Sequence, residues 1–317
     1  MAQPTNTFDT YDAVGIREDL SDVVKNISPW ETPFYSGIRS GEKANSTLVE
    51  WEVDELSSVD ASNQVIEGDE ATLDAISAPS KFNNRTQIFD KTAVVSGTSQ
   101  AVVSAGGTVK MAYQIVKKTK ELKRDIETRL LSNNVRVTGN ATTARELSGY
   151  ECWITNGVIG TAGSPALPTG DGSDAPTDAS SGVVFTEARL KAVLALCYDD
   201  GGMPDSVYMG SFNKQVASGF TGHSSRTDKG EDKKLVAAID VYVSDWGELK
   251  FVNSRFCRSR TVPVIQMDMW EIRALRPTRN WALAKTGDSD KRQILCELTL
   301  CALAPKSSGG VFDCTTS

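Results

Sequence analysis

The sequence predicts an α+β protein, and three observations support this class. The stretch 47–56 alternates apolar and polar residues as a half-buried strand does, and 86–95 is a second extended run. A third stretch, 109–133, contains no glycine or proline and is rich in strong helix formers. With 317 residues, the chain has room for one large domain with projections or for two medium domains.

The composition is that of an ordinary soluble protein. The formal net charge is -7, so the overall field repels nucleic acid and a dedicated DNA-binding role is disfavoured. The first residues lack the features of a secretory leader and no run is long enough to span a bilayer, so we expect folding in a cytoplasm. The six cysteines lack metal-site spacing and the single histidine, His223, lies in a polar run. We therefore predict no metal or cofactor site.

The N-terminal region is predicted to be an arm that docks on another surface. Residues 13–28 place apolar side chains on one helical stripe, and Pro29 ends that helix. Two prolines then push the backbone towards extended or turn conformations, while Trp30, Phe34 and Tyr35 remain available for packing.

A long β-hairpin is predicted next, with 47–56 and 86–95 as its legs. The first leg alternates around Trp51, and a mostly polar stretch separates the two legs. Such a hairpin is marginal in water unless another part of the fold or another subunit covers it. The legs can also pair acidic against basic residues: the acidic ones are Glu50, Glu52 and Asp54, and the basic ones are Lys81, Arg85 and Lys91.

The predicted helix 109–133 carries seven basic and three acidic residues. Contact with phosphates is one interpretation of this surplus, but a solvated face with ion pairs between neighbouring turns is favoured. A low-complexity loop follows at 160–182, and then a helix near 186–197 and several short strands. The apolar run 292–305 is predicted to be a central strand.

Motifs for catalysis are scarce in this chain. A Lys-Thr-Gly triplet at 285–287 matches that of serine β-lactamases, and Ser-x-x-Lys occurs at 40–43 and at 211–214. No Ser-Asp-Asn accompanies them, and the common nucleotide, zinc and calcium motifs are absent from the sequence. Since only one histidine is available for acid-base chemistry, the sequence indicates a structural rather than a catalytic protein.

Six ordered blocks carry a resemblance over nearly the whole chain. They are REDLSDVVKNISPWETPF, NNRTQIFDKTAVVSGTSQAV, KTKELKRDIETRLL, VYVSDWGELKFVNSR, LAKTGDSDKRQI and CELTLCALAP. These blocks look like motifs of the SU10-type major capsid subfamily, within the tailed-bacteriophage major capsid proteins that share the Hong Kong 97-like fold.

The resemblance implies a layout along the chain. The long helix would be the spine of a peripheral domain, and the loops of an axial domain would meet around the capsomer axes. The implied regions are an N-terminal arm at 1–45, an extended β-hairpin loop at 46–100, a peripheral domain at 101–182 with spine helix 109–133 and an excursion at 160–182, an axial α/β domain at 183–285, and a return strand with C-terminal tail at 286–317.

The resemblance also implies a function without a reaction. Copies would assemble as hexamers and pentamers into the icosahedral head shell of a virion, around double-stranded DNA held non-specifically on the inner face. A portal would be a partner, with or without scaffolding or decoration proteins, and no membrane would be involved. A compartment shell, another virion component or, far behind, a serine hydrolase stays as an alternative.

Candidate contacts between subunits come from the arm and the hairpin. Aromatic and apolar side chains would anchor the interface, and charged ones would set its specificity. The alternative for each is packing within its own subunit, and for Trp51 the two are equally favoured. The candidates are Trp30, Phe34, Tyr35, Glu50, Trp51, Glu52, Asp54, Lys81, Arg85, Ile88 and Lys91.

Overall fold

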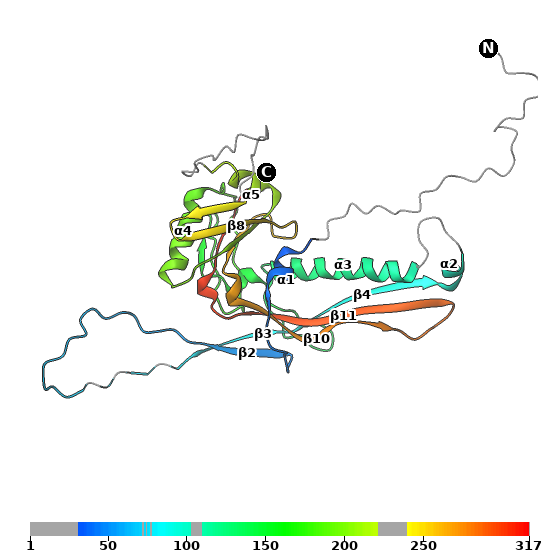
Figure 1. Cartoon of the computed structure of the whole chain (residues 1–317), viewed down its shortest axis with the longest axis horizontal. Coiled ribbons are helices and arrows are strands. Elements are labelled where there is room, and N and C mark those ends of the chain that lie inside the picture. Colours follow the sequence, from blue (N-terminus) through cyan, green and yellow to red (C-terminus); the bar gives the residue numbers. More distant parts are fainter. Residues whose placement is uncertain are drawn as a thin grey trace, which may run out of the picture.

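A computed structural model of the chain shows two sheets, a long helix and a projecting hairpin (Figure 1). The predicted arm helix 13–28 and Trp30 lie outside the residues that it describes. Those residues are 31–71, 73, 75–76, 78–102, 110–220 and 240–316.

Among the described residues, four strands form the first sheet, which we call sheet A, in the order β1-β10-β11-β4. The apolar run that predicted a central strand is β11, which is paired on one side with β10 and on the other with β4. This prediction is therefore confirmed. The strands are β1 (Arg39–Ser40), β4 (Gln87–Ser96), β10 (Trp270–Ala282) and β11 (Ser289–Ala302).

Helix α3 (Lys110–Leu130) runs along one face of sheet A, as expected for the stretch 109–133 (Figure 1). Its stripe of Leu122, Ile126 and Leu130 is at most 1% exposed and packs in a core with Phe89 of β4. The other side of the helix faces away from the sheet, so it can carry lysines without burying their charges.

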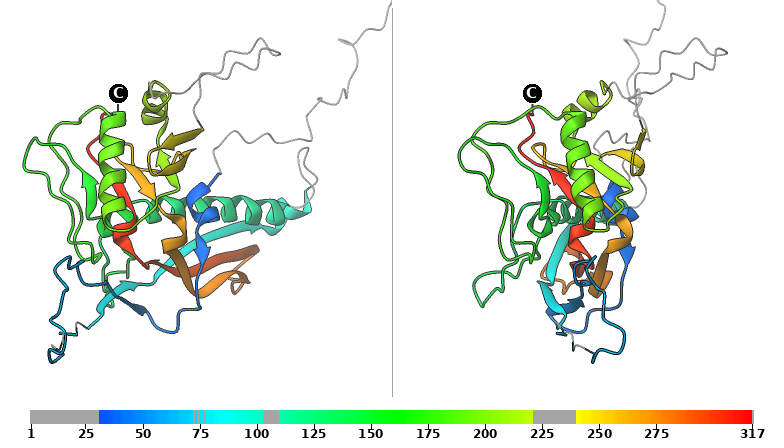
Figure 2. Two further views of the ribbon diagram at one scale, coloured as in Figure 1. Left: turned by 60° about the vertical axis from the view of Figure 1, so that its left-hand side comes forward. Right: turned by 90° about the vertical axis from the view of Figure 1, so that its left-hand side faces the viewer.

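A second sheet, which we call sheet B, contains six strands within the described part of the chain, in the order β5-β12-β9-β6-β8-β7. Helix α4 (Glu187–Asp199), predicted near 186–197, packs against it, and α5 (Ser211–Ala217) follows β6. Figure 2 shows these elements as a separate lobe beside sheet A. The strands are β5 (Asn156–Val158), β6 (Ser206–Met209), β7 (Val241–Ser244), β8 (Gly247–Asn253), β9 (Val262–Ile265) and β12 (Gly309–Val311).

The hairpin differs from its prediction in its second leg. The first leg is β2 (Leu48–Val53), but its partner is β3 (Ser80–Arg85), and the predicted leg 86–95 is β4 of sheet A. The sequence of β3, SKFNNR, is polar and does not alternate, whereas β4 finds a more apolar partner in β11.

The arm also differs from its prediction near residue 33. Residues Pro33–Gly37 form a short helix, α1, rather than an extended path. Pro33 occupies the first helical turn, where a missing N–H breaks no hydrogen bond.

Long-range pairing crosses the expected regions of the chain. Strand β10, expected with the lobe, pairs with β11 in sheet A, and β12, expected in a tail, lies inside sheet B between β5 and β9. The remaining short elements are α2 (Gly97–Ala101) and the 3-10 helices Tyr150–Trp153, Met267–Met269 and Pro305–Ser307. None of the described helices is long and apolar enough to cross a membrane.

Candidate interaction surface

The root of the hairpin is packed against its own chain through Trp51. This side chain is 7% exposed, its ring centroid lies 5.5 Å from that of Trp153, and its Nε1 donates to the backbone oxygen of Ala302 at 2.8 Å. The indole thus satisfies its polar group while burying its ring, which favours packing within the subunit. Trp51 therefore anchors the hairpin to the body.

Asn84 of β3 is a second anchor, one that sequence reasoning missed. It is fully buried, and its Nδ2 donates to the backbone oxygen of Leu300 at 2.8 Å. Its Oδ1 accepts the N–H of Ser148 at 2.9 Å. A buried amide with these partners ties β3 to sheet A, and nothing in the local sequence SKFNNR distinguishes it from its neighbour Asn83.

The outer face of the hairpin is charged and exposed. Lys81 of β3 forms an ion pair with Glu50 of β2 at 2.8 Å, and its register partner is Glu52. The hydrogen bond to Glu50 raises the pKa of Lys81. Acidic residues of β2 thus face a basic residue of β3, while Lys91 pairs instead with Asp125 of α3 at 2.6 Å.

The loop joining β2 to β3, residues 54–79, projects from the body (Figure 1). Its sequence contains seven carboxylates and no lysine or arginine. At its base, Glu55 pairs with Lys306 at 2.8 Å. Large apolar side chains further out have almost no cover from their own chain: Leu56 is 99% exposed, Val59 98%, Val65 83%, Ile66 78%, Leu73 94% and Ile76 97%.

The arm joins the body at a buried junction around Phe34. Its ring makes edge contacts with Tyr150 and Tyr208, at centroid distances of 6.4 and 5.6 Å. The backbone N–H groups of Phe34 and Tyr35 donate to the carboxylate of Glu127 on α3, at 3.0 and 2.6 Å. Burial raises the pKa of Glu127, although the two N–H donors oppose the shift. Glu127 therefore caps α1 from a different element.

The structure brings the predicted contact residues together in three places. Phe34 and Tyr35 lie at the arm junction. Glu50, Trp51, Glu52, Lys81 and Arg85 lie in the hairpin, with Asp54 at its exposed end, and Ile88 and Lys91 lie on β4. Phe34 is covered by its own chain, as Trp51 is, whereas Ile88 is 46% exposed. A role between subunits stays a prediction for the whole set.

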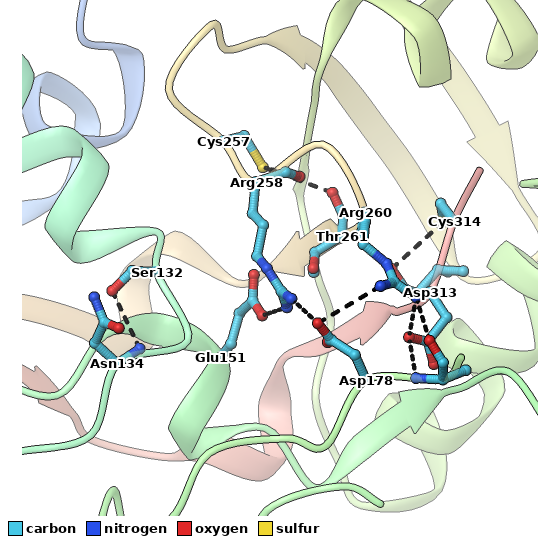
Figure 3. A network of polar contacts seen from close by, with 12 residues as sticks. Ser132, Asn134, Glu151, Asp178, Cys257, Arg258, Arg260, Thr261, Asp313 and Cys314 are labelled. Carbon is cyan, nitrogen blue, oxygen red and sulfur yellow. Dashed lines mark hydrogen bonds and ion pairs between the residues drawn. The ribbon is translucent and has the colours of Figure 1, made fainter. Parts of the chain in front are cut away.

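A network of charged side chains, also missed from the sequence, holds the excursion 160–182 to the lobe (Figure 3). Arg258 pairs with Asp178 and, at 2.9 Å, with the buried Glu151. Arg260 pairs with Asp313 at 3.2 Å, and the Asp313 carboxylate accepts two backbone N–H groups, from residues 160 and 179. Burial raises the pKa of Glu151 to about 7, despite the opposing charge of Arg258.

The described residues offer little for metal or nucleophilic chemistry. No group of three or more His, Cys, Asp or Glu side chains in this part of the chain could hold a metal ion, and all six cysteines are buried, free thiols. Lys214 of one Ser-x-x-Lys pair binds Asp240 and the Phe251 carbonyl. The Lys-Thr-Gly triplet lies between β10 and β11 of sheet A, whereas the 211–214 pair is in α5, which follows β6 of sheet B.

The chain combines a long helix on sheet A, a separate lobe and a projecting loop, and solved capsid structures share this fold. The "Cyanophage A-1(L) capsid asymmetric unit" matches with a TM-score of 0.65 at 12% identity, over 98% of this chain and 99% of that one. The "Capsid of native GTA particle" matches with a TM-score of 0.63 at 10% identity, over 96% and 98%. The predicted α+β phage capsid fold is confirmed.

Sequence comparison then defines the family. The chain belongs to the SU10 major capsid protein family, whose model matches residues 3–315. A relative named "Major capsid protein", from Escherichia phage Phieco32, is 26% identical over 351 aligned positions, which cover 98% of each chain. The predicted function, a major capsid protein of a tailed phage and a component of its virion, is confirmed at this level.

Proposed function

We propose that copies of the chain assemble as hexamers and pentamers into the icosahedral head, and that loop 54–79 of each copy lies on a neighbouring subunit. The observation that carries this proposal is the exposure of six large apolar side chains on that loop, each at 78% or more. Isolated exposed apolar residues are normal on protein surfaces, but a projecting segment that carries six of them indicates an interaction surface.

The free energy gained when a neighbouring subunit covers these six side chains supports an assembly role. Covering one such side chain contributes about 1.5 to 3 kcal/mol, so covering six is worth on the order of 10 kcal/mol. Ordering the loop costs part of that gain. In a closed shell the contact recurs in every copy, so a modest net stabilisation at each contact is enough to hold a large assembly together.

The two sheets support a division into a peripheral part and an axial part. We assign sheet A and α3 to the peripheral part, and sheet B with α4 and α5 to the axial part. The arm would cover 1–45 and the projecting loop 46–85. Residues 86–100, which the sequence places in the extended loop 46–100, are assigned to the peripheral part because β4 pairs with β11 there.

We further propose that the subunit works through its interfaces and performs no reaction. Family membership and the engagement of Lys214 by Asp240 support this. Assembly in the host cytoplasm, contact with a portal, with or without scaffolding or decoration proteins, and packaged double-stranded DNA inside the shell belong to the same proposal.

Electron microscopy of two loop variants tests the proposal. In the first, residues 56–77 are replaced by a short Gly-Ser linker, which keeps β2 and β3. In the second, the six exposed apolar residues become serine at unchanged length. We expect both to give soluble, folded subunits that form no stable shells.

A matched control changes polar residues of the same loop, Ser57, Ser58, Ser62 and Asn63, to alanine, and it should form normal shells. Shells of normal yield from the two loop variants would refute the role of the loop. A wild-type protein that remains monomeric under every condition, with no icosahedral particle containing it, would refute the assembly itself.

A further inference from the structure

The face of α3 that points away from sheet A is cationic. Lys117, Lys120 and Lys123 are exposed on it, and Arg124 is half-buried with its guanidinium over the Phe256 ring at 5.3 Å. At 100° per residue these four positions fall within about a third of the helix circumference, opposite the buried stripe of Leu122 and Ile126.

The three carboxylates of α3 all have partners. Glu121 pairs with Lys118 at 2.7 Å, Asp125 pairs with Lys91 of β4 at 2.6 Å, and Glu127 accepts the N–H groups of α1. Ion pairs between neighbouring turns, the favoured explanation of the basic surplus, therefore engage Lys118 in direct contact, and Lys117 adds a weaker attraction to the same Glu121 carboxylate. The stripe keeps a positive field on a chain whose net charge is -7.

We infer that this stripe of α3, from Lys117 to Arg124, contacts the phosphate backbone of double-stranded DNA. The inference rests on the proposed shell function, which places such DNA against one face of the subunit. The face of the subunit that meets the DNA is then the one that carries α3. The hairpin lies on the other side of the long strands (Figure 1).

The dimensions of the stripe suit a weak, non-specific contact. From Lys117 to Arg124 the helix rises about 10 Å, and a duplex presents one phosphate charge per ~1.7 Å of axis. Two or three phosphates can therefore meet these side chains. A contact of this size is weak in each subunit.

The acidic loop 54–79 of another copy is the competing occupant of the stripe. It carries charge of the right sign, but its six exposed apolar side chains need an apolar surface. Between Lys117 and Arg124 the stripe presents only ammonium and guanidinium groups, and the exposed Tyr113 and Val116 lie at one end. Phosphates match this surface better than the loop does.

Fluorescence anisotropy with a 20-base-pair duplex of mixed sequence tests the inference. The full-length, unassembled subunit is titrated at several salt concentrations, beside K117E/K123E and a control, K43E/K250E. The control reverses two exposed lysines elsewhere and changes the net charge equally. We expect K117E/K123E to bind at least tenfold more weakly at low salt and to lose about two units of the log-log salt slope.

Each outcome decides between the alternatives. Equal weakening in the control, or no loss in K117E/K123E, overturns the inference. Unchanged DNA binding together with loss of shells and loss of binding to a peptide of residues 54–79 assigns the stripe to a neighbouring copy instead. If K117E/K123E forms normal shells and binds DNA as the wild type does, this inference fails while the shell function stands.

Discussion

The N–H of Tyr35 donates to the buried carboxylate of Glu127 at 2.6 Å, across 92 positions of sequence. One side chain of α3 thereby holds α1 to the body, and the Phe34 ring packs beside it against Tyr150 and Tyr208. The arm is thus attached by a polar contact and an aromatic contact, which substitutions can separate.

Replacing Glu127 by alanine should detach α1. The N–H groups of Phe34 and Tyr35 would then be buried without an acceptor, at a cost of about 1 to 3 kcal/mol each. Glu127→Gln keeps an acceptor oxygen and should lose less. Urea unfolding of the unassembled subunit, with hydrogen exchange at Phe34 and Tyr35, measures both effects. Equal losses from the two variants would contradict the capping role.

The stability of the lobe should depend on the ionisation of Glu151. Its pKa rises from 4.5 to about 7 in the folded chain, so the folded state binds the proton more tightly than the unfolded state does. Such a group stabilises the fold below pH 4.5, and this contribution disappears as the pH rises through 7. The shift corresponds to about 3 kcal/mol.

The measurement compares the wild type with Glu151→Gln by urea unfolding from pH 5 to pH 8.5. The wild type should lose stability relative to the variant across this range, because glutamine remains neutral. Glu248→Gln, at an exposed site on β8, controls for the loss of one carboxylate. A difference between Glu151→Gln and the wild type that stays constant with pH would show that the pKa of Glu151 is not raised.

Asn84 should contribute far more to stability than its neighbour Asn83. Asn84→Ala leaves the N–H of Ser148 and the carbonyl of Leu300 without their side-chain partner, and we expect a loss of about 2 to 4 kcal/mol. The matched variant Asn83→Ala, on the same strand, should cost less than about 1 kcal/mol. Similar losses would mean that the contacts of Asn84 do not hold the hairpin root.

The sequence predicts those elements whose pattern is local. Helix α3 follows from a long run without helix breakers, and β2 from the alternation around Trp51. The stretch of β4 is predicted as a strand but with the wrong partner, because a local extended run indicates a strand and not which strand lies beside it. Its true partner, β11, lies about two hundred positions later.

The polar contacts could not be predicted for the same reason. Glu127, Glu151 and Asn84 look like ordinary surface residues in their local sequence, and each is buried only because a distant segment covers it. The contact of Phe34 with Glu127 was equally hidden, although the aromatic content around Pro33 did indicate a docking segment. The periodicity of residues along the chain does not reveal such contacts between distant segments.

The position of β12 has a consequence for synthesis. This strand lies between β5 and β9, so both of these strands wait for residues 309–311 before sheet B is continuous. A nascent chain can form α4 early, but it cannot close the lobe until translation has passed that point. Chains that terminate early would keep open sheet edges, which marks them for proteolysis or aggregation before they can enter a growing particle. A copy that lacks residues 309–311 therefore cannot complete sheet B.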